Sequence, residues 1–133
     1  MPAPPPTAGE PWIGIVDDDA PLRMALERAL KGRGFRVTTF ASGEEFLECH
    51  HETPPACIVL DVRLFGMSGF DVQDQLVKRG NSPPIVFITS HDGMLAEAAR
   101  ARSACLIKPF DMDALVALLR PHVTHVSVVL RTA

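Results

Sequence analysis

Polar side chains follow four short apolar runs of the sequence, at the point where each run ends. These side chains are acids, hydroxyls and an amine: Asp17-Asp18-Asp19, Asp61, Thr89-Ser90 and Lys108. Carboxylates that converge on a small volume repel one another unless some are protonated or a cation binds them. Oxygen ligands with room for water suit Mg²⁺. An ammonium and a hydroxyl beside such a cation would draw off the negative charge of a phosphoryl group, so the residue types indicate phosphoryl chemistry.

One of the aspartates is a candidate nucleophile, since a carboxylate can attack phosphorus and form an acyl phosphate. Asp61 stands singly, whereas Asp17 and Asp18 are adjacent and better placed to hold a metal. We therefore assign the attack to Asp61. Each residue alone has an ordinary explanation as a turn, cap or surface residue. The prediction depends on their combination.

Alternating strands and helices are expected to position these residues. The apolar runs are four to six residues long and predict strands at 12–16, 35–40, 56–60, 85–88 and 104–107. The runs around Ile15, Val59 and Val86 are apolar at nearly every position, which is typical of a strand covered on both faces. The intervening stretches have a helical period, with Pro21, Ser42 and Ser68 at first-turn or capping positions.

The order is therefore strand then helix, repeated five times. Short connections in such an order require parallel pairing, right-handed crossovers and helices on both faces, which is a doubly wound α/β domain. In this class of fold, ligands bind beyond the carboxyl ends of the strands. All four groups of polar residues would meet there.

The composition of the chain excludes several classes of function. The chain of 133 residues fits one domain, and its 13 Lys and Arg against 16 Asp and Glu give a net charge of −3. Without a basic surplus, direct binding of nucleic acid is not expected. No apolar run approaches the length of a membrane span and the first basic residue is Arg23, so we expect neither a membrane segment nor a signal peptide, and a cytoplasmic location. The three cysteines indicate neither a disulfide framework nor a zinc site and are expected to be small buried hydrophobes.

The two ends of the chain differ from its middle. Five of the 12 prolines fall within residues 1–11, which predicts a disordered tail before a domain at 12–121. Residues 122–133 are a C-terminal extension or the start of a linker, and could continue the last helix or add a strand. A helix-turn-helix module does not fit after Pro121. The chain is therefore expected to be a single-domain regulator or the N-terminal piece of a longer protein, and its apolar 126–130 segment could dock on another copy as a homodimer.

The ordered set of motifs resembles the receiver domain of two-component response regulators, in particular the receivers of nitrogen-fixation-type regulators. The likeness covers residues 12 to about 120. Its residues are Val16-Asp17-Asp18-Asp19, Ser42-Gly43-Glu44, Asp61-Val62-Arg63-Leu64 with Gly66-Met67-Ser68-Gly69, Ile88-Thr89-Ser90 and Lys108-Pro109-Phe110. It implies a flavodoxin-like (βα)5 fold, in which a five-stranded parallel sheet has the order 2-1-3-4-5.

The resemblance also implies a role for each matching residue. Asp61 would accept a phosphoryl group from a histidine kinase or phosphotransfer protein. Mg²⁺ would be held by Asp18 and Asp61 directly, by Asp17 mostly through water, and by the backbone carbonyl of Arg63. Thr89 and Lys108 would bind the phosphoryl oxygens, and the Lys108–Pro109 bond would be cis. The domain would be a phosphorelay switch for a downstream protein or output domain, with self-catalysed transfer and slow autodephosphorylation instead of enzymatic turnover.

Three departures from the family pattern affect this expectation. Phe65 stands where a proline is common, and the segment between Thr89 and Lys108 is short. Cys105 occupies the position of a switching aromatic residue, which puts the usual coupling to Thr89 in question. His91 and Arg63 would lie at the mouth of the site and could shield an acyl phosphate from water.

Two other functions are compatible with the same residues. The first is a phosphorylation-independent interaction module that keeps the receiver fold. The second is a small phosphohydrolase of the haloacid-dehalogenase type, in which Asp17 of the Asp17-x-Asp19 pair would be the nucleophile.

Overall fold

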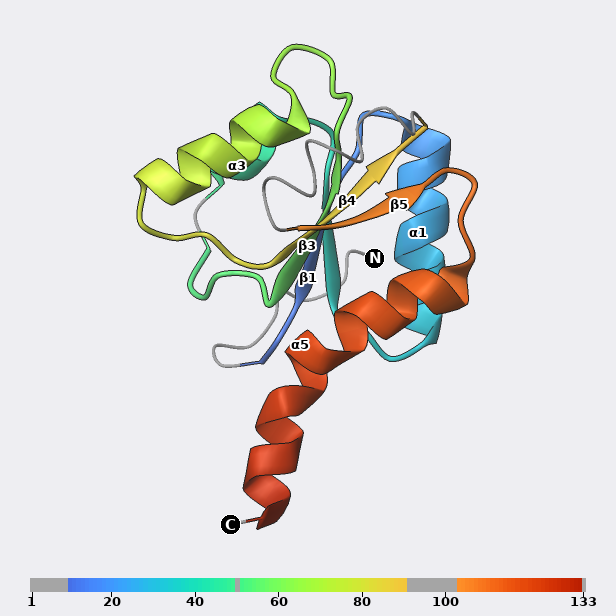
Figure 1. Cartoon of the computed structure of the whole chain (residues 1–133), viewed down its shortest axis with the longest axis vertical. Helices are drawn as coiled ribbons and strands as arrows, with labels where there is room; N and C mark the ends of the chain where they lie inside the picture. Colours follow the sequence, from blue (N-terminus) through green and yellow to red (C-terminus); the bar gives the residue numbers. More distant parts are fainter. Residues whose placement is uncertain (1–9, 50, 91–102, 133) are drawn as a thin grey trace, which may run out of the picture.

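The computed structural model describes residues 10–49, 51–90 and 103–132 and contains a twisted parallel sheet with helices on both faces (Figure 1). All neighbouring strands pair in parallel, in the order β2-β1-β3-β4-β5. The strands are β1 (Ile13–Val16), β2 (Val37–Phe40), β3 (Cys57–Asp61), β4 (Ile85–Thr89) and β5 (Ala104–Ile107). The predicted doubly wound fold and its strand order are confirmed.

The burial of the strands follows from their composition. Every residue of β1, β3 and β4 is buried, as expected for central strands covered on both faces. The outer strands β2 and β5 are mostly half-buried because each has only one neighbour. The apolar runs of the sequence therefore identified the centre of the sheet correctly.

The described helices are α1 (Ala20–Gly32), α2 (Gly43–Glu48), α3 (Gly69–Lys78) and α5 (Met112–Thr132). In Figure 1, α3 lies on one side of the sheet and α1 on the other. Leu26 and Leu30 of α1 share a core with Leu115 and Leu119 of α5, whereas α2 and α3 pack on the opposite face. The helix expected between β4 and β5 and most of the expected tail at 1–11 lie outside the described residues.

Local signals in the sequence set the helix ends. The side chains of Asp19, Ser42 and Ser68 accept hydrogen bonds from the first turns of α1, α2 and α3. Gly34 and Gly80, which follow α1 and α3, have φ angles of 92° and 72° and permit the chain to reverse there. The predicted capping positions are thus confirmed, with Pro21 in the first turn of α1.

The backbone after Pro121 is helical. The first of the alternatives for residues 122–133 is observed: α5 continues as far as Thr132 and projects away from the sheet (Figure 1). The proline lies inside this helix. Within the described part of the chain, no helix combines the length and the hydropathy needed to cross a bilayer.

The expectation that all three cysteines are buried was wrong. Cys57 on β3 is buried, Cys105 on β5 is half-buried and Cys49 is exposed. The reason is that α2 ends at Glu48, so Cys49 is its C-cap and no longer belongs to the apolar face of the helix.

Candidate functional site

The carboxyl edge of the sheet brings the predicted site residues together. Asp61 pairs in register with Ile88 of β4, so that Thr89 lies one residue further along the same edge. The backbone hydrogen bonds between β4 and β5 continue past the end of β5, because the N–H of Lys108 donates to the carbonyl of Thr89 at 2.7 Å. The peptide bond from Lys108 to Pro109 is cis, as the resemblance implied.

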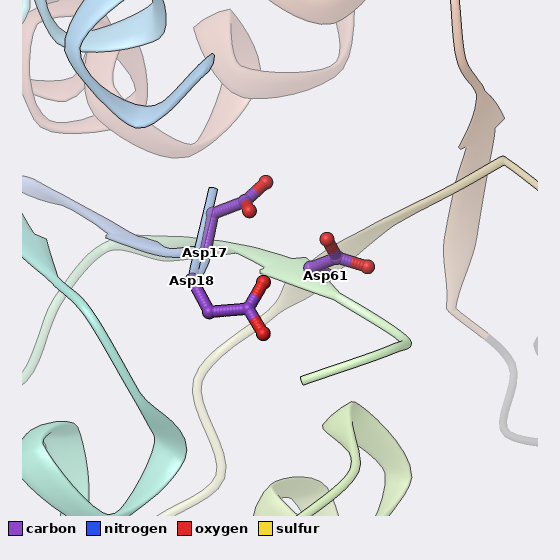
Figure 2. A group of neighbouring side chains, drawn as sticks. All are labelled: Asp17, Asp18 and Asp61. Carbon is purple, nitrogen blue, oxygen red and sulfur yellow. The ribbon is translucent and has the colours of Figure 1, made fainter. Parts of the chain in front are cut away.

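Three carboxylates form a compact group at this edge (Figure 2). Asp17, Asp18 and Asp61 each offer one oxygen, and these oxygens lie within 4.8 Å of one another. Asp17 is fully buried, Asp61 is 4% exposed and Asp18 is open to solvent. Asp19 has a different role, because its carboxylate accepts from the backbone N–H of Leu22 and caps α1.

The lysine of the site contacts two of these acids. Its Nζ lies 2.9 Å from Oδ2 of Asp61 and 3.5 Å from Oδ2 of Asp17. The shorter contact is a charge-assisted hydrogen bond, whereas the longer one is too long for a good hydrogen bond and is an electrostatic contact. Oδ2 of Asp17 is buried and has no hydrogen-bond partner among the described residues.

Burial and charge shift the pKa values of this cluster. Burial, assisted by the negative charge of Asp61, raises the pKa of Asp17 from 3.8 to about 6, although the N–H of Asp19 and the charge of Lys108 oppose it. Burial by itself lowers the pKa of Lys108, but its hydrogen bond to Asp61 and the charges of both acids outweigh burial and raise it above the ordinary value. The amine is therefore held firmly in its charged form.

The donor set fits a hard divalent cation. The three acids each offer one oxygen to a small volume, and Asp17 has a buried oxygen without a hydrogen-bond partner in the described structure. An uncompensated buried carboxylate oxygen is costly, and a cation with oxygen preference would remove that cost. Asp17, Asp18 and Asp61 are therefore the residues that could hold Mg²⁺.

Two supporting residues were missed by the sequence reasoning. A Cβ atom on Gly69 would lie 2.5 Å from the carbonyl oxygen of Asp61, so only glycine lets α3 begin this close to the site. The guanidinium of Arg23 donates to the backbone carbonyl of Asp17 at 2.7 Å. A glycine directly after the capping Ser68 is a weak signal of close approach, but nothing in the sequence indicates the contact made by Arg23.

The remaining candidate residues surround the cluster. Thr89 is fully buried at the end of β4, and Arg63 is exposed on the loop after β3. The half-buried Cys105 packs against the core shared by α2 and α3. His91, which was expected at the mouth of the site, lies outside the described residues.

A family model described as the response regulator receiver domain matches residues 13–120, which is most of the chain. The chain belongs to this receiver family. The resemblance inferred from the motifs is thereby confirmed, and the domain is a receiver of the kind found in two-component systems.

Similar proteins include longer regulators. The receiver is 35% identical over 116 residues to the DNA-binding transcriptional regulator NtrC of Escherichia coli K12, a match that covers 85% of this chain and 25% of the relative. It is 38% identical over 115 residues to the response regulator protein TmoT of Ectopseudomonas mendocina, covering 84% and 52%. Among solved structures, the response regulator StyR superposes with a TM-score of 0.79 at 35% identity, covering 93% and 64%. The receiver thus spans a quarter to about half of the length of these two curated relatives.

Proposed function

We propose that this receiver accepts a phosphoryl group on Asp61 from a histidine kinase or phosphotransfer protein, in a reaction that depends on Mg²⁺. The observation that carries the proposal is that the Asp61 carboxylate belongs to a group of acids suited to a divalent cation and also makes the shorter contact, 2.9 Å, with the ammonium of Lys108. Both the cation and the ammonium would bind the oxygens of a phosphoryl group that approaches this carboxylate. It is therefore the best nucleophile of the cluster.

In the transfer, one Asp61 oxygen forms a bond to phosphorus while the bond from phosphorus to the donor breaks, and the leaving group keeps the electron pair. The backbone N–H of Arg63 holds Oδ1 of Asp61 at 2.9 Å and fixes the direction of the carboxylate. Lys108 passes from Oδ2 of Asp61 to a phosphoryl oxygen and neutralises charge that develops there. Thr89, at the end of the adjacent strand, would donate its hydroxyl to another oxygen.

Mg²⁺ held by Asp17, Asp18 and Asp61, with the backbone carbonyl of Arg63, would supply Lewis-acid stabilisation of the phosphoryl oxygens. The buried oxygen of Asp17 supports this assignment. Movement of Thr89 and Lys108 toward the new oxygens would shift the surface at β5 and bias an equilibrium that a downstream protein or output domain reads.

The phosphodonor protein needs a surface near the site, and the lining of an apolar groove of about 500 Å³ includes Lys108, the residue that contacts Asp61. It runs between α1 and the segment after β5, and Lys108 itself forms one wall. We assign this groove to the donor because a partner seated in it is held next to the amine that contacts Asp61. Its lining is Leu22, Ala25, Leu26, Ala29, Lys108, Pro109, Phe110 and Met112.

The geometry disfavours the phosphohydrolase alternative. Such an enzyme would use Asp17 as the nucleophile together with the carboxylate of Asp19, but the Asp19 side chain accepts from the backbone N–H of Leu22 and caps α1. We accordingly propose a switch that catalyses only its own phosphorylation and slow dephosphorylation, and that works in the cytoplasm.

The test is phosphorylation of the whole chain by acetyl phosphate and MgCl2, followed by intact mass and phosphopeptide mapping. We expect one base-labile phosphoryl group on Asp61, absent from Asp61→Asn and without Mg²⁺. Asp19→Asn is the matched control, because asparagine caps a helix as well as aspartate does and the same charge is removed two residues from Asp17. Phosphate on Asp17, or undiminished labelling of Asp61→Asn, would refute the assignment. Unchanged partner binding by Asp61→Asn would favour the phosphorylation-independent module.

A further inference from the structure

Each of the three clustered carboxylates is held on one oxygen by a single backbone N–H. Asp17 Oδ1 accepts from Asp19 at 2.9 Å, and Asp61 Oδ1 accepts from Arg63 at 2.9 Å. Asp18 Oδ2 accepts from Phe65 at 2.8 Å. In every case the second oxygen of the carboxylate is left for a different partner.

The third of these hydrogen bonds differs from the other two in its origin. The bonds to Asp17 and Asp61 come from residues two positions along the chain, so the local turn provides them. The bond to Asp18 joins residues 47 positions apart and connects the β1 edge to the loop after β3. Asp18 is also the exposed member of the cluster, and among the described residues no other hydrogen bond or ion pair holds its carboxylate.

We infer that the backbone N–H of Phe65 is a positioning group for Asp18, which keeps one carboxylate oxygen directed toward the cation site. This inference rests on the magnesium binding proposed above. A solvent-exposed aspartate otherwise samples several side-chain conformations, and ordering it costs free energy when a ligand binds. A hydrogen bond already present without the metal removes part of that cost.

The side chain of Phe65 has little part in this role. The ring is 87% exposed, so it is not packed in the core, while the preceding Leu64 is buried and anchors the loop. The next residue, Gly66, has a φ of 86° and turns the chain. The anchored loop therefore presents the N–H of residue 65, and a substitution there can remove that N–H with little loss of packing.

The chain offers a matched pair of variants. Phe65→Pro lacks the N–H, because proline has no amide hydrogen, whereas Phe65→Ala keeps the N–H and removes the ring. Titration of the full-length, metal-free protein with MgCl2, followed by calorimetry or by amide chemical shifts, should give a dissociation constant about fivefold larger for Phe65→Pro. Phe65→Ala should stay within about twofold of the wild type. Equal or tighter binding by a folded Phe65→Pro would overturn the inference.

A second measurement on the wild type does not depend on the variant folding. Hydrogen exchange of the Phe65 amide should be protected without Mg²⁺ and remain protected at saturating Mg²⁺, because the N–H and the cation use different oxygens. Loss of protection on adding Mg²⁺ would show that the N–H and the cation compete for the carboxylate, and would also overturn the inference.

The titrations also separate the two proposals. If the wild type and Phe65→Ala both fail to bind Mg²⁺, the proposed metal site itself fails. If both bind and Phe65→Pro binds equally well, only the positioning role fails.

Discussion

Replacing Asp17 by asparagine is expected to stabilise the metal-free protein near neutral pH, although it removes a residue of the site. Asp17 is fully buried, and its Oδ2 has no hydrogen-bond partner among the described residues. Burial is the main reason that its pKa rises from 3.8 to about 6. At pH 7.5 the folded protein therefore carries a charged group in a place that disfavours charge.

The sign and size of the effect follow from linkage. Because the pKa of Asp17 is higher in the folded state than in the unfolded chain, the folded state binds this proton more tightly. The stability that Asp17 contributes is therefore complete below about pH 4 and is lost as the pH rises to about 6 and beyond. A change in pKa from 3.8 to about 6 corresponds to about 3 kcal/mol as an upper bound. Asparagine cannot ionise, so Asp17→Asn avoids this loss.

The assay is urea unfolding in EDTA at pH 4 and pH 7.5, followed by the fluorescence of Trp12. This is the one tryptophan of the chain and it is only 3% exposed, so its emission reports unfolding. Asp17→Asn should exceed the wild type by up to about 3 kcal/mol at pH 7.5 and match it at pH 4. Asp19→Asn, in which asparagine keeps the cap of α1, is the control for removing one negative charge two residues from Asp17. A difference of the same size at both pH values, or a less stable Asp17→Asn at pH 7.5, would contradict the reasoning.

Three further predictions concern the residues around the cluster. Lys108→Ala should slow phosphorylation by acetyl phosphate about a hundredfold, since it removes the donor that lies 2.9 Å from Asp61; a rate within threefold of the wild type would exclude this role. Gly69→Ala should lower the free energy of unfolding by about 1–3 kcal/mol, because its Cβ would lie 2.5 Å from the carbonyl of Asp61. Gly32→Ala, in the last turn of α1 with open space around it, should be neutral or slightly stabilising in the same urea titration. Ala25→Glu in the apolar groove should slow phosphoryl transfer from a purified phosphorylated histidine kinase about tenfold, because it places a charge in an apolar contact. The rate with acetyl phosphate as the donor should not change. The control Val77→Glu, on the exposed face of α3, should change neither rate.

The sequence predicted the fold and the proximity of the three acids and the lysine, for a physical reason. Central strands of a parallel sheet are apolar throughout, so the polar residue that follows each one marks where the strand ends. Parallel strands place all of these ends on one edge, which is why Asp17, Asp61 and Lys108 could be expected near one another before any coordinates were known. The capping residues Ser42 and Ser68 were visible because their side chains act within three residues along the chain.

Features that depend on the detailed three-dimensional arrangement of the chain could not be predicted in the same way. The guanidinium of Arg23 bonds to a backbone carbonyl, an acceptor that every residue has, so no sequence pattern marks it. The bond from Phe65 to Asp18 depends on where two loops lie relative to each other, and the sequence shows only an unusual ring at position 65. The exposure of Cys49 depends on the exact residue at which α2 ends, and helix ends are the least certain part of a prediction from sequence.

The charges of the cluster explain why its parts depend on one another. Three carboxylates and one ammonium leave two negative charges uncompensated, and the buried Asp17 has the highest cost because it cannot be solvated. A divalent cation would balance these charges, and a phosphoryl group could then approach Asp61 without net repulsion. Stability of the metal-free fold and readiness for phosphoryl transfer are therefore opposed at Asp17. Asp18 has the opposite environment, since its side chain is exposed to solvent and only one hydrogen bond among the described residues holds its carboxylate. The loop that carries Phe65 provides that order, so the protein combines a buried acid that needs a cation with an exposed acid oriented to bind it.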